Sequence, residues 1–149
     1  MIIRTVTTLA IGLCVSTTLA FAASKDDAVA MVKKTVAAIK ADGTEKAYAA
    51  INTPGSIFQD GEVYVVVLGA DGTTLAHPIN PKLIGKNMME VQDVDGKFFT
   101  KDMVTRAQKE ASFWYDFKFV NPATKKIQVK DMYCEALAPT AVCAGVYRP

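Results

Sequence analysis

The spacing of apolar residues changes near Glu62, from a helical period to runs that are typical of strands. Before that point, apolar residues recur three and four positions apart over residues 24–41, with lysines and aspartates between them. This spacing predicts a long amphipathic helix. An Asp-Gly pair then ends the helix, and Thr44 is a candidate cap for a short second helix over residues 44–51. A helical start followed by strands favours an α+β domain.

Strand-like runs rich in β-branched and aromatic residues follow at residues 63–69, 73–77, 111–120, 126–137 and 140–148. The first two runs are joined by Ala-Asp-Gly, a tight turn in which the glycine supplies a positive φ. A corner containing two prolines and a polar helical segment over residues 98–109 separate the second run from the third. We therefore expect one antiparallel sheet of about five strands, with a long N-terminal helix and helices between strands 2 and 3.

The first 22 residues have the layout of a cleavable signal peptide. Arg4 is followed by an apolar, threonine-rich centre, and small residues at Ala20 and Ala22 precede the first charged residues of the domain. The competing interpretation is an uncleaved membrane anchor, but hydroxyl residues interrupt the apolar span. We expect residues 1–22 to be removed and residues 23–149 to form a single domain that is periplasmic or secreted.

Charge and cysteine content narrow the classes of function. The whole chain has a net charge of +2, and removal of Arg4 with the signal peptide leaves +1. This balance and the lack of a basic block argue against nucleic acid as a partner. Cys134 and Cys143 remain after cleavage, and an oxidising compartment permits them to form a disulfide across the last hairpin.

Four segments carry a family resemblance: "VYVVVLGADGTTLAHPINPKLIGKN", "DGKFFTK", "FWYDFKFVNPATKK" and "VCAGVY". In this order they resemble the single Cache domain, a PAS-like extracytoplasmic sensor module of bacteria. The resemblance covers essentially the whole chain after residue 22, and the "AHP-x-NP-x-LIGKN" run is its most specific part. It implies a PAS-like antiparallel sheet, a long N-terminal helix, and a small-ligand pocket between the sheet and the segments that cross it.

The resemblance also implies ligands and partners. Such domains bind small metabolites, commonly acetate, propionate, pyruvate or lactate and sometimes amines or amino acids, and they usually belong to chemoreceptors, histidine kinases or cyclases. No signalling domain follows Pro149 in this sequence, so we expect a stand-alone secreted member that acts with a separate membrane-bound receptor or kinase.

Candidate ligand-binding residues combine polar groups with apolar surroundings: Tyr64, His77, Asn87, Trp114, Tyr115, Lys118 and Tyr133. Lys118 would neutralise a carboxylate, tyrosine hydroxyls would donate hydrogen bonds, and Trp114 or Tyr115 would cover the apolar end. His77, the only histidine, lies in the corner that Pro78 and Pro81 make rigid.

Each candidate also has a structural interpretation. Tyr64 can place its hydroxyl at the surface, and His77 can simply bond a neighbouring carbonyl. Asn87 can cap the next helix. Because side chains alternate along a strand, only one of Trp114 and Tyr115 can face the ligand, and the sequence leaves open which face that is.

Recognition without an arginine clamp favours a monocarboxylate, because only Arg106 and Arg148 follow residue 22. An aromatic box around Asp116 would instead favour an amine. No nucleophile elbow, phosphate-binding loop or metal-ligand cluster is present, so we expect no enzyme, no metal and no cofactor. The predicted function is binding of a small organic acid, and the alternatives are an amine or amino-acid binder or a ligand-free interaction subunit of a membrane sensor.

Overall fold

The computed structural model describes residues 23–149, and the predicted signal peptide lies outside the described residues. Helix α1 (Lys25–Asp42) begins with a capping box, in which the Ser24 hydroxyl accepts from the Asp27 N–H and the Asp27 carboxylate accepts from the Ser24 N–H. Helix α2 (Thr44–Ile51) follows directly. The N-cap of α2 is Gly43, with φ of 83°, so the expectation that Thr44 caps this helix is wrong.

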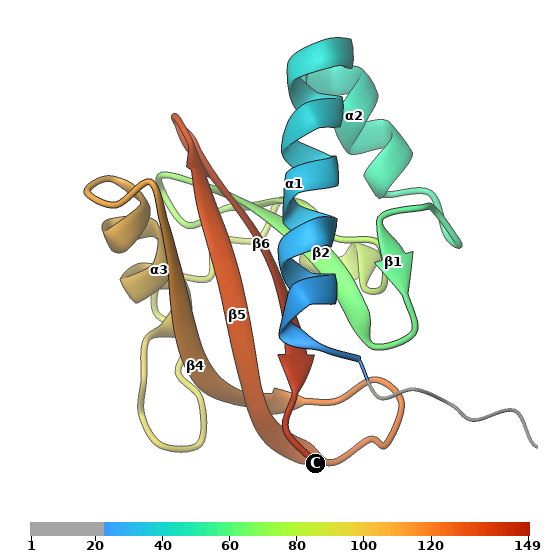
Figure 1. Ribbon diagram of the computed structural model, residues 1–149. Helices are drawn as coiled ribbons and strands as arrows, with labels where there is room; N and C mark the ends of the chain where they lie inside the picture. Colours follow the sequence, from blue (N-terminus) through green and yellow to red (C-terminus); the bar gives the residue numbers. More distant parts are fainter. Residues whose placement is uncertain (1–22) are drawn as a thin grey trace, which may run out of the picture.

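The strands form one antiparallel sheet in the order β1-β2-β6-β5-β4 (Figure 1). Strand β1 pairs with the first two residues of β2, and β3 pairs with Val67 and Leu68 of the same strand. Their bounds are β1 (Gln59–Asp60), β2 (Val63–Gly69), β3 (Thr74–Ala76), β4 (Ser112–Val120), β5 (Ile127–Leu137) and β6 (Thr140–Tyr147). The predicted α+β class and antiparallel sheet are confirmed. The structure adds one strand to the five that the sequence predicts, the two-residue β1, which is too short to show an alternation of apolar and polar residues.

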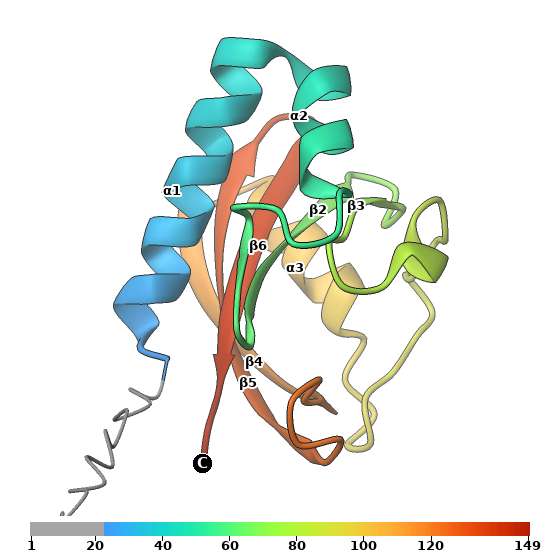
Figure 2. The same cartoon turned by 90° about the vertical axis from the view of Figure 1, so that its right-hand side faces the viewer.

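The sheet separates two apolar cores, because successive residues of each strand point to opposite faces. On one face, alternate residues of β2 and β6 such as Val65 and Ala144 pack against α1 and α2. On the other face, residues such as Phe113, Phe117 and Met132 pack against α3 (Phe99–Ala107). Figure 2 shows α1 along one side of the sheet and α3 with the connecting loops along the other.

The segment between β3 and β4 covers the second face. It contains the single-turn helix η1 (Pro81–Leu83) and then α3, as the sequence predicts for the region between the second and third long runs. Within residues 23–149, no helix combines the length and the apolar character that crossing a bilayer requires.

The predicted disulfide joins Cys134 of β5 to Cys143 of β6, and both residues are fully buried. The two cysteines are directly opposite each other in the β5–β6 register. The bond therefore fixes the pairing of the last two strands beneath α3.

Removal of this disulfide should lower the free energy of unfolding by about 2 to 3 kcal/mol. The closed loop is short, with a sequence separation of 9, so the entropy that the bond removes from the unfolded chain is small for a disulfide. Urea unfolding with and without reductant measures the difference. A Cys134→Ala, Cys143→Ala double variant is the control and should not respond to reductant. Equal midpoints for oxidised and reduced wild-type protein would contradict the prediction.

Candidate functional site

A small cavity lies between the sheet and the segment that carries η1 and α3, and its volume is about 50 Å³. Its polar lining residues are Tyr64, Thr74, His77, Thr100 and Lys130. Its apolar lining residues are Val66, Leu68, Leu83, Met88, Phe99, Met103, Phe117, Phe119 and Met132. The cavity is therefore larger than the space that one water molecule needs.

Lys130 is the most unusual residue of the cavity, because its side chain is fully buried without an ionic partner. It is 1% exposed, and its Nζ lies 3.7 Å from the centre of the Tyr64 ring and 4.9 Å from that of the Tyr147 ring. None of the ion pairs among residues 23–149 includes it. Burial lowers the pKa of Lys130, although Tyr64 and Glu62 oppose the shift. Two aromatic faces stabilise the ammonium but leave its charge unneutralised.

The space that Lys130 occupies exists because residue 145 is a glycine. Gly145 of β6 lies opposite Met132 of β5. A Cβ atom at Gly145 would lie 2.6 Å from the Met132 Sδ, 2.6 Å from the Asp131 carbonyl oxygen and 3.0 Å from the Lys130 Cε. Any side chain at this position would therefore displace the lysine and the floor of the cavity.

His77 is a neutral hydrogen-bond donor at the end of the cavity. Its backbone N–H donates to the Asn52 Oδ1 at 2.9 Å, and its Nδ1 accepts from the Asn80 N–H at 3.0 Å. Burial, followed by the charge of Lys130, lowers the pKa of His77 to about 4. Because Nδ1 accepts a hydrogen bond, the single ring proton is on Nε2, the nitrogen left to donate to another group.

The Tyr64 hydroxyl takes part in a short chain of hydrogen bonds behind Lys130. The Tyr147 hydroxyl donates to the Val120 carbonyl at 3.0 Å, so its oxygen can accept from the Tyr64 hydroxyl, 3.4 Å away. The Tyr64 ring also lies 5.1 Å from the His77 ring, measured between centroids. Tyr64, His77 and Lys130 thus lie close together in the cavity, whose other polar lining residues are Thr74 and Thr100.

Of the seven predicted site residues, Tyr64 and His77 line this cavity. Trp114 and Tyr133 lie on the opposite face of the sheet, where their rings pack at 5.3 Å near α1. The Lys25 ammonium lies 4.9 Å from the centre of the Trp114 ring. The sheet itself therefore separates Trp114 and Tyr133 from the cavity.

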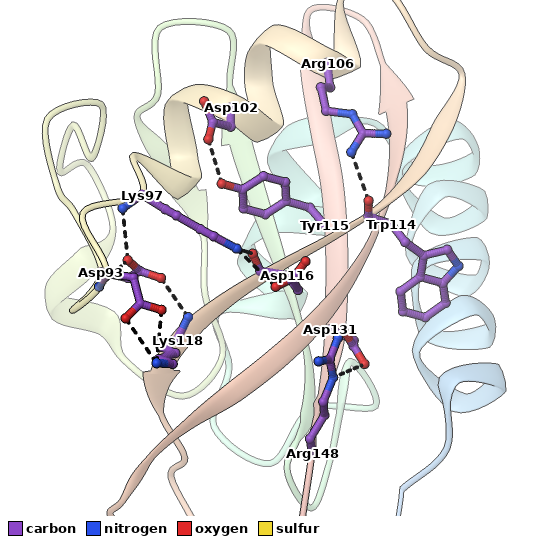
Figure 3. Close-up of polar contacts among 11 residues, drawn as sticks. Asp93, Lys97, Asp102, Arg106, Trp114, Tyr115, Asp116, Lys118, Asp131 and Arg148 are labelled. Atoms are coloured by element: carbon purple, nitrogen blue, oxygen red, sulfur yellow. Dashed lines mark hydrogen bonds and ion pairs between the residues drawn. The ribbon is translucent and has the colours of Figure 1, made fainter.

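Tyr115, Lys118 and Asn87 also lie outside the cavity, and each is held by other groups (Figure 3 shows the first two). The Tyr115 hydroxyl donates to the Asp102 Oδ2 at 2.6 Å. The Lys118 ammonium pairs with Asp95 at 3.0 Å. The Asn87 amide donates to the Asp71 carbonyl at 2.7 Å, which ties the corner to the β2–β3 turn.

Lys130 is the cavity residue that the sequence analysis missed. In "KIQVKDMYC", Lys130 alternates with Met132 and Cys134 on one face of the strand, while Asp131 and Tyr133 share the other. A lysine that alternates with apolar residues on the buried face of a strand is the sequence signal that could have identified it. The same alternation predicts the separate faces of Phe117 and Trp114, which the structure confirms, with the Phe117 face toward the cavity.

An antiparallel PAS-like sheet with a small, mostly apolar cavity under a crossing segment is the architecture of a small-molecule sensor domain. The family model "Single Cache domain 2" matches residues 15–147. The chain therefore belongs to the single Cache domain family. No curated protein matches it.

Solved structures share this fold. A methyl-accepting chemotaxis protein from Vibrio parahaemolyticus is 21% identical, with a TM-score of 0.70 and coverage of 83% of this chain and 87% of that chain. The periplasmic sensor domain of a chemotaxis protein is 21% identical, with a TM-score of 0.66 and coverage of 83% and 90%. A Cache chemosensory domain whose structure describes carboxylic acid recognition is 17% identical, with a TM-score of 0.69 and coverage of 83% and 92%.

Protonation of His77 should make the free energy of unfolding depend on pH between about pH 6.5 and pH 4. The folded protein keeps His77 neutral down to about pH 4, whereas the unfolded chain protonates it near 6.5. As the pH falls from 6.5 to 4, only the unfolded state gains this proton, so the free energy of unfolding should decrease by up to about 3 kcal/mol. Above pH 7 this contribution is constant.

Urea unfolding between pH 7 and pH 4 measures this dependence, with His77→Asn as the matched control. The Asn Oδ1 can still accept from the Asn80 N–H, but the side chain does not titrate. The variant should therefore have the shallower pH dependence in this window. Parallel curves for the two proteins would rule out His77 as the buried titrating group.

Proposed function

We propose that this protein is an exported sensor domain that binds a short monocarboxylate such as acetate, propionate, pyruvate or lactate. The ligand would lie in the cavity between the sheet and α3 that Lys130 lines. The observation that supports this proposal is the buried Lys130 ammonium, which lines the cavity and has no ion pair among the described residues. A buried charge is stabilised when a partner of opposite charge reaches it. A small anion would provide that partner.

The other cavity groups fit the remaining atoms of such a ligand. The His77 Nε2–H and the Tyr64 hydroxyl are donors for carboxylate oxygens, and the walls from Phe99, Phe117 and Met132 offer apolar contact to a short alkyl chain. A dicarboxylate would need a second cation, and Lys130 is the one cationic residue that lines the cavity among residues 23–149. No carboxylate among residues 23–149 lines the cavity, so an amine ligand would have no charge partner there.

The family and the proposed ligand together favour binding without turnover. A separate membrane-bound receptor or kinase would receive the signal from the liganded domain, and the likeness of this fold to sensor domains of chemotaxis proteins supports this role. The amine or amino-acid binder and the ligand-free interaction subunit are the alternatives that a ligand screen separates.

Titration calorimetry should detect binding of at least one short monocarboxylate by residues 23–149. Lys130→Met should lower the affinity about 10-fold to 100-fold, because a hydrogen bond to a charged group contributes about 1.5 to 3 kcal/mol. Lys118→Met is the matched control, because Lys118 lies on the adjacent strand and its ammonium forms an ion pair with Asp95. The affinity of this variant for the acid should equal that of the wild type.

Two results would contradict this proposal. Retained affinity in a folded Lys130→Met variant would remove Lys130 from the site. No binding of any acid by the wild-type domain would favour the interaction-subunit alternative. Urea unfolding checks that each variant is folded, and Lys130→Met should be at least as stable as the wild type because it removes a buried charge.

Export should give a mature protein that begins at or near Ala23. Ala20 and Ala22 supply the small residues that signal peptidases require. Intact-mass measurement of the protein from the periplasm or the medium tests this expectation. A product that retains Met1 to Ala22 would contradict both the cleavage and the proposed location.

A further inference from the structure

Lys130 has the surroundings of a nucleophilic amine as well as those of an anion-binding cation. A lysine becomes nucleophilic when an apolar site disfavours its charged form and no carboxylate holds its proton. Both conditions are met here, since Lys130 is 1% exposed and none of the ion pairs of residues 23–149 includes it. By contrast, Lys97 and Lys118 do form ion pairs, and their side chains are 41% and 40% exposed.

The groups around the amine are neutral on the sides that face it. Tyr64 of β2 and Tyr147 of β6 present their rings, and the neutral His77 ring lies beyond Tyr64. Glu62 is the acidic residue whose charge opposes the lowering of the Lys130 pKa, and its carboxylate accepts from the Asn121 amide at 2.9 Å. Burial is the largest cause of the lowered pKa of Lys130, so the neutral amine is more accessible here than for a solvated lysine.

We infer that Lys130 captures a small 2-oxo monocarboxylate as a reversible imine in this cavity. The inference rests on the proposed function, because the same cavity admits the ligand and the same nitrogen faces its carboxylate. It narrows the ligand class from short monocarboxylates in general to those with a carbonyl carbon next to the carboxylate. Acetate and lactate have no such carbonyl and can bind only without a covalent bond.

The chemistry is balanced without an oxidant or a reductant. The ammonium loses a proton, the free amine attacks the carbonyl carbon, and the carbonyl oxygen takes up protons and leaves as water. Overall, the lysine ammonium and the ketone give a protonated imine and one water molecule. The positive charge stays on nitrogen, so the adjacent carboxylate keeps its charge partner after the bond has formed.

Two neutral donors, His77 and Tyr64, line the cavity together with Lys130. The His77 Nε2–H is the neutral donor at the cavity that can bind the carbonyl oxygen while the amine attacks. The Tyr64 hydroxyl lies 3.4 Å from the Tyr147 hydroxyl and can turn to a carboxylate oxygen. The apolar remainder of the wall suits a methyl group or a hydrogen atom on the far side of the carbonyl.

Reductive trapping tests the inference. The folded domain is incubated at neutral pH with pyruvate or glyoxylate and cyanoborohydride, which reduces an imine to a stable secondary amine. Intact-mass measurement and peptide mapping should show one principal adduct on Lys130, formed at least ten times faster than on any other lysine. Lactate with cyanoborohydride should give no adduct, and excess lactate should slow trapping of pyruvate by competing for the cavity.

Two variants sharpen the assignment. Lys130→Arg keeps a positive charge but cannot form an imine, so it should lose the principal adduct, whereas Lys118→Arg should keep it. Peptide mapping of the wild type decides the question even if Lys130→Arg does not fold. Adducts spread evenly over surface lysines, or a principal adduct at another lysine, would overturn the inference.

Calorimetry with acetate and lactate keeps the two proposals distinguishable. Binding of these acids without selective trapping at Lys130 would overturn the imine and leave the carboxylate site intact. Selective trapping at Lys130 without measurable binding of either acid would support covalent capture and contradict the broader monocarboxylate proposal.

Discussion

The rest of the site depends on the burial of one ammonium group between two tyrosine rings. Transfer of a lysine charge out of water costs several kcal/mol, and contacts with aromatic faces offset part of that cost. The Lys130 Nζ lies 3.7 Å from the centre of the Tyr64 ring, and the absence of a side chain at Gly145 makes room for its Cε. A protein that evolved only for stability has no reason to keep this arrangement, because an apolar residue of similar volume would fit without a charge. A bound anion would supply the reason.

The alternation of side chains along β5 connects this site to the opposite face of the sheet. Lys130 faces the cavity, and the next residue, Asp131, faces α1, where it pairs with Arg148 at 2.6 Å and with Lys25 at 3.4 Å. Arg148 lies just beyond β6, and Lys25 begins α1. Neighbouring residues of one strand therefore hold the charge that faces the cavity and the ion pairs at both ends of the described domain.

The fold could be predicted because it rests on periodicity, whereas only two of the predicted site residues line the cavity, namely Tyr64 in a strand and His77 in the proline-containing corner. The helix of α1 and the long strands follow from spacing, and the two prolines near His77 identified the corner that borders the cavity. Lys118 is a candidate in the sequence because it alternates with aromatic residues, but in the structure its ammonium pairs with Asp95 of the neighbouring loop, outside the cavity. Such a pairing depends on how the chain returns to β4, and no local pattern contains that information.

The proton on Lys130 links the two proposed kinds of ligand. A carboxylate without a carbonyl favours the ammonium form and should raise the lysine pKa on binding, so its affinity falls at high pH. Imine formation requires the free amine for the attack on the carbonyl carbon, but its product is a cation. The lowered pKa of Lys130 therefore matters only for the attack. The same burial that lowers the pKa of Lys130 would therefore serve both ligands, because it favours anions that neutralise the ammonium and makes the free amine available to a carbonyl. Discrimination between acids of similar size would then come from a covalent bond, which a cavity of about 50 Å³ could hardly achieve by shape alone.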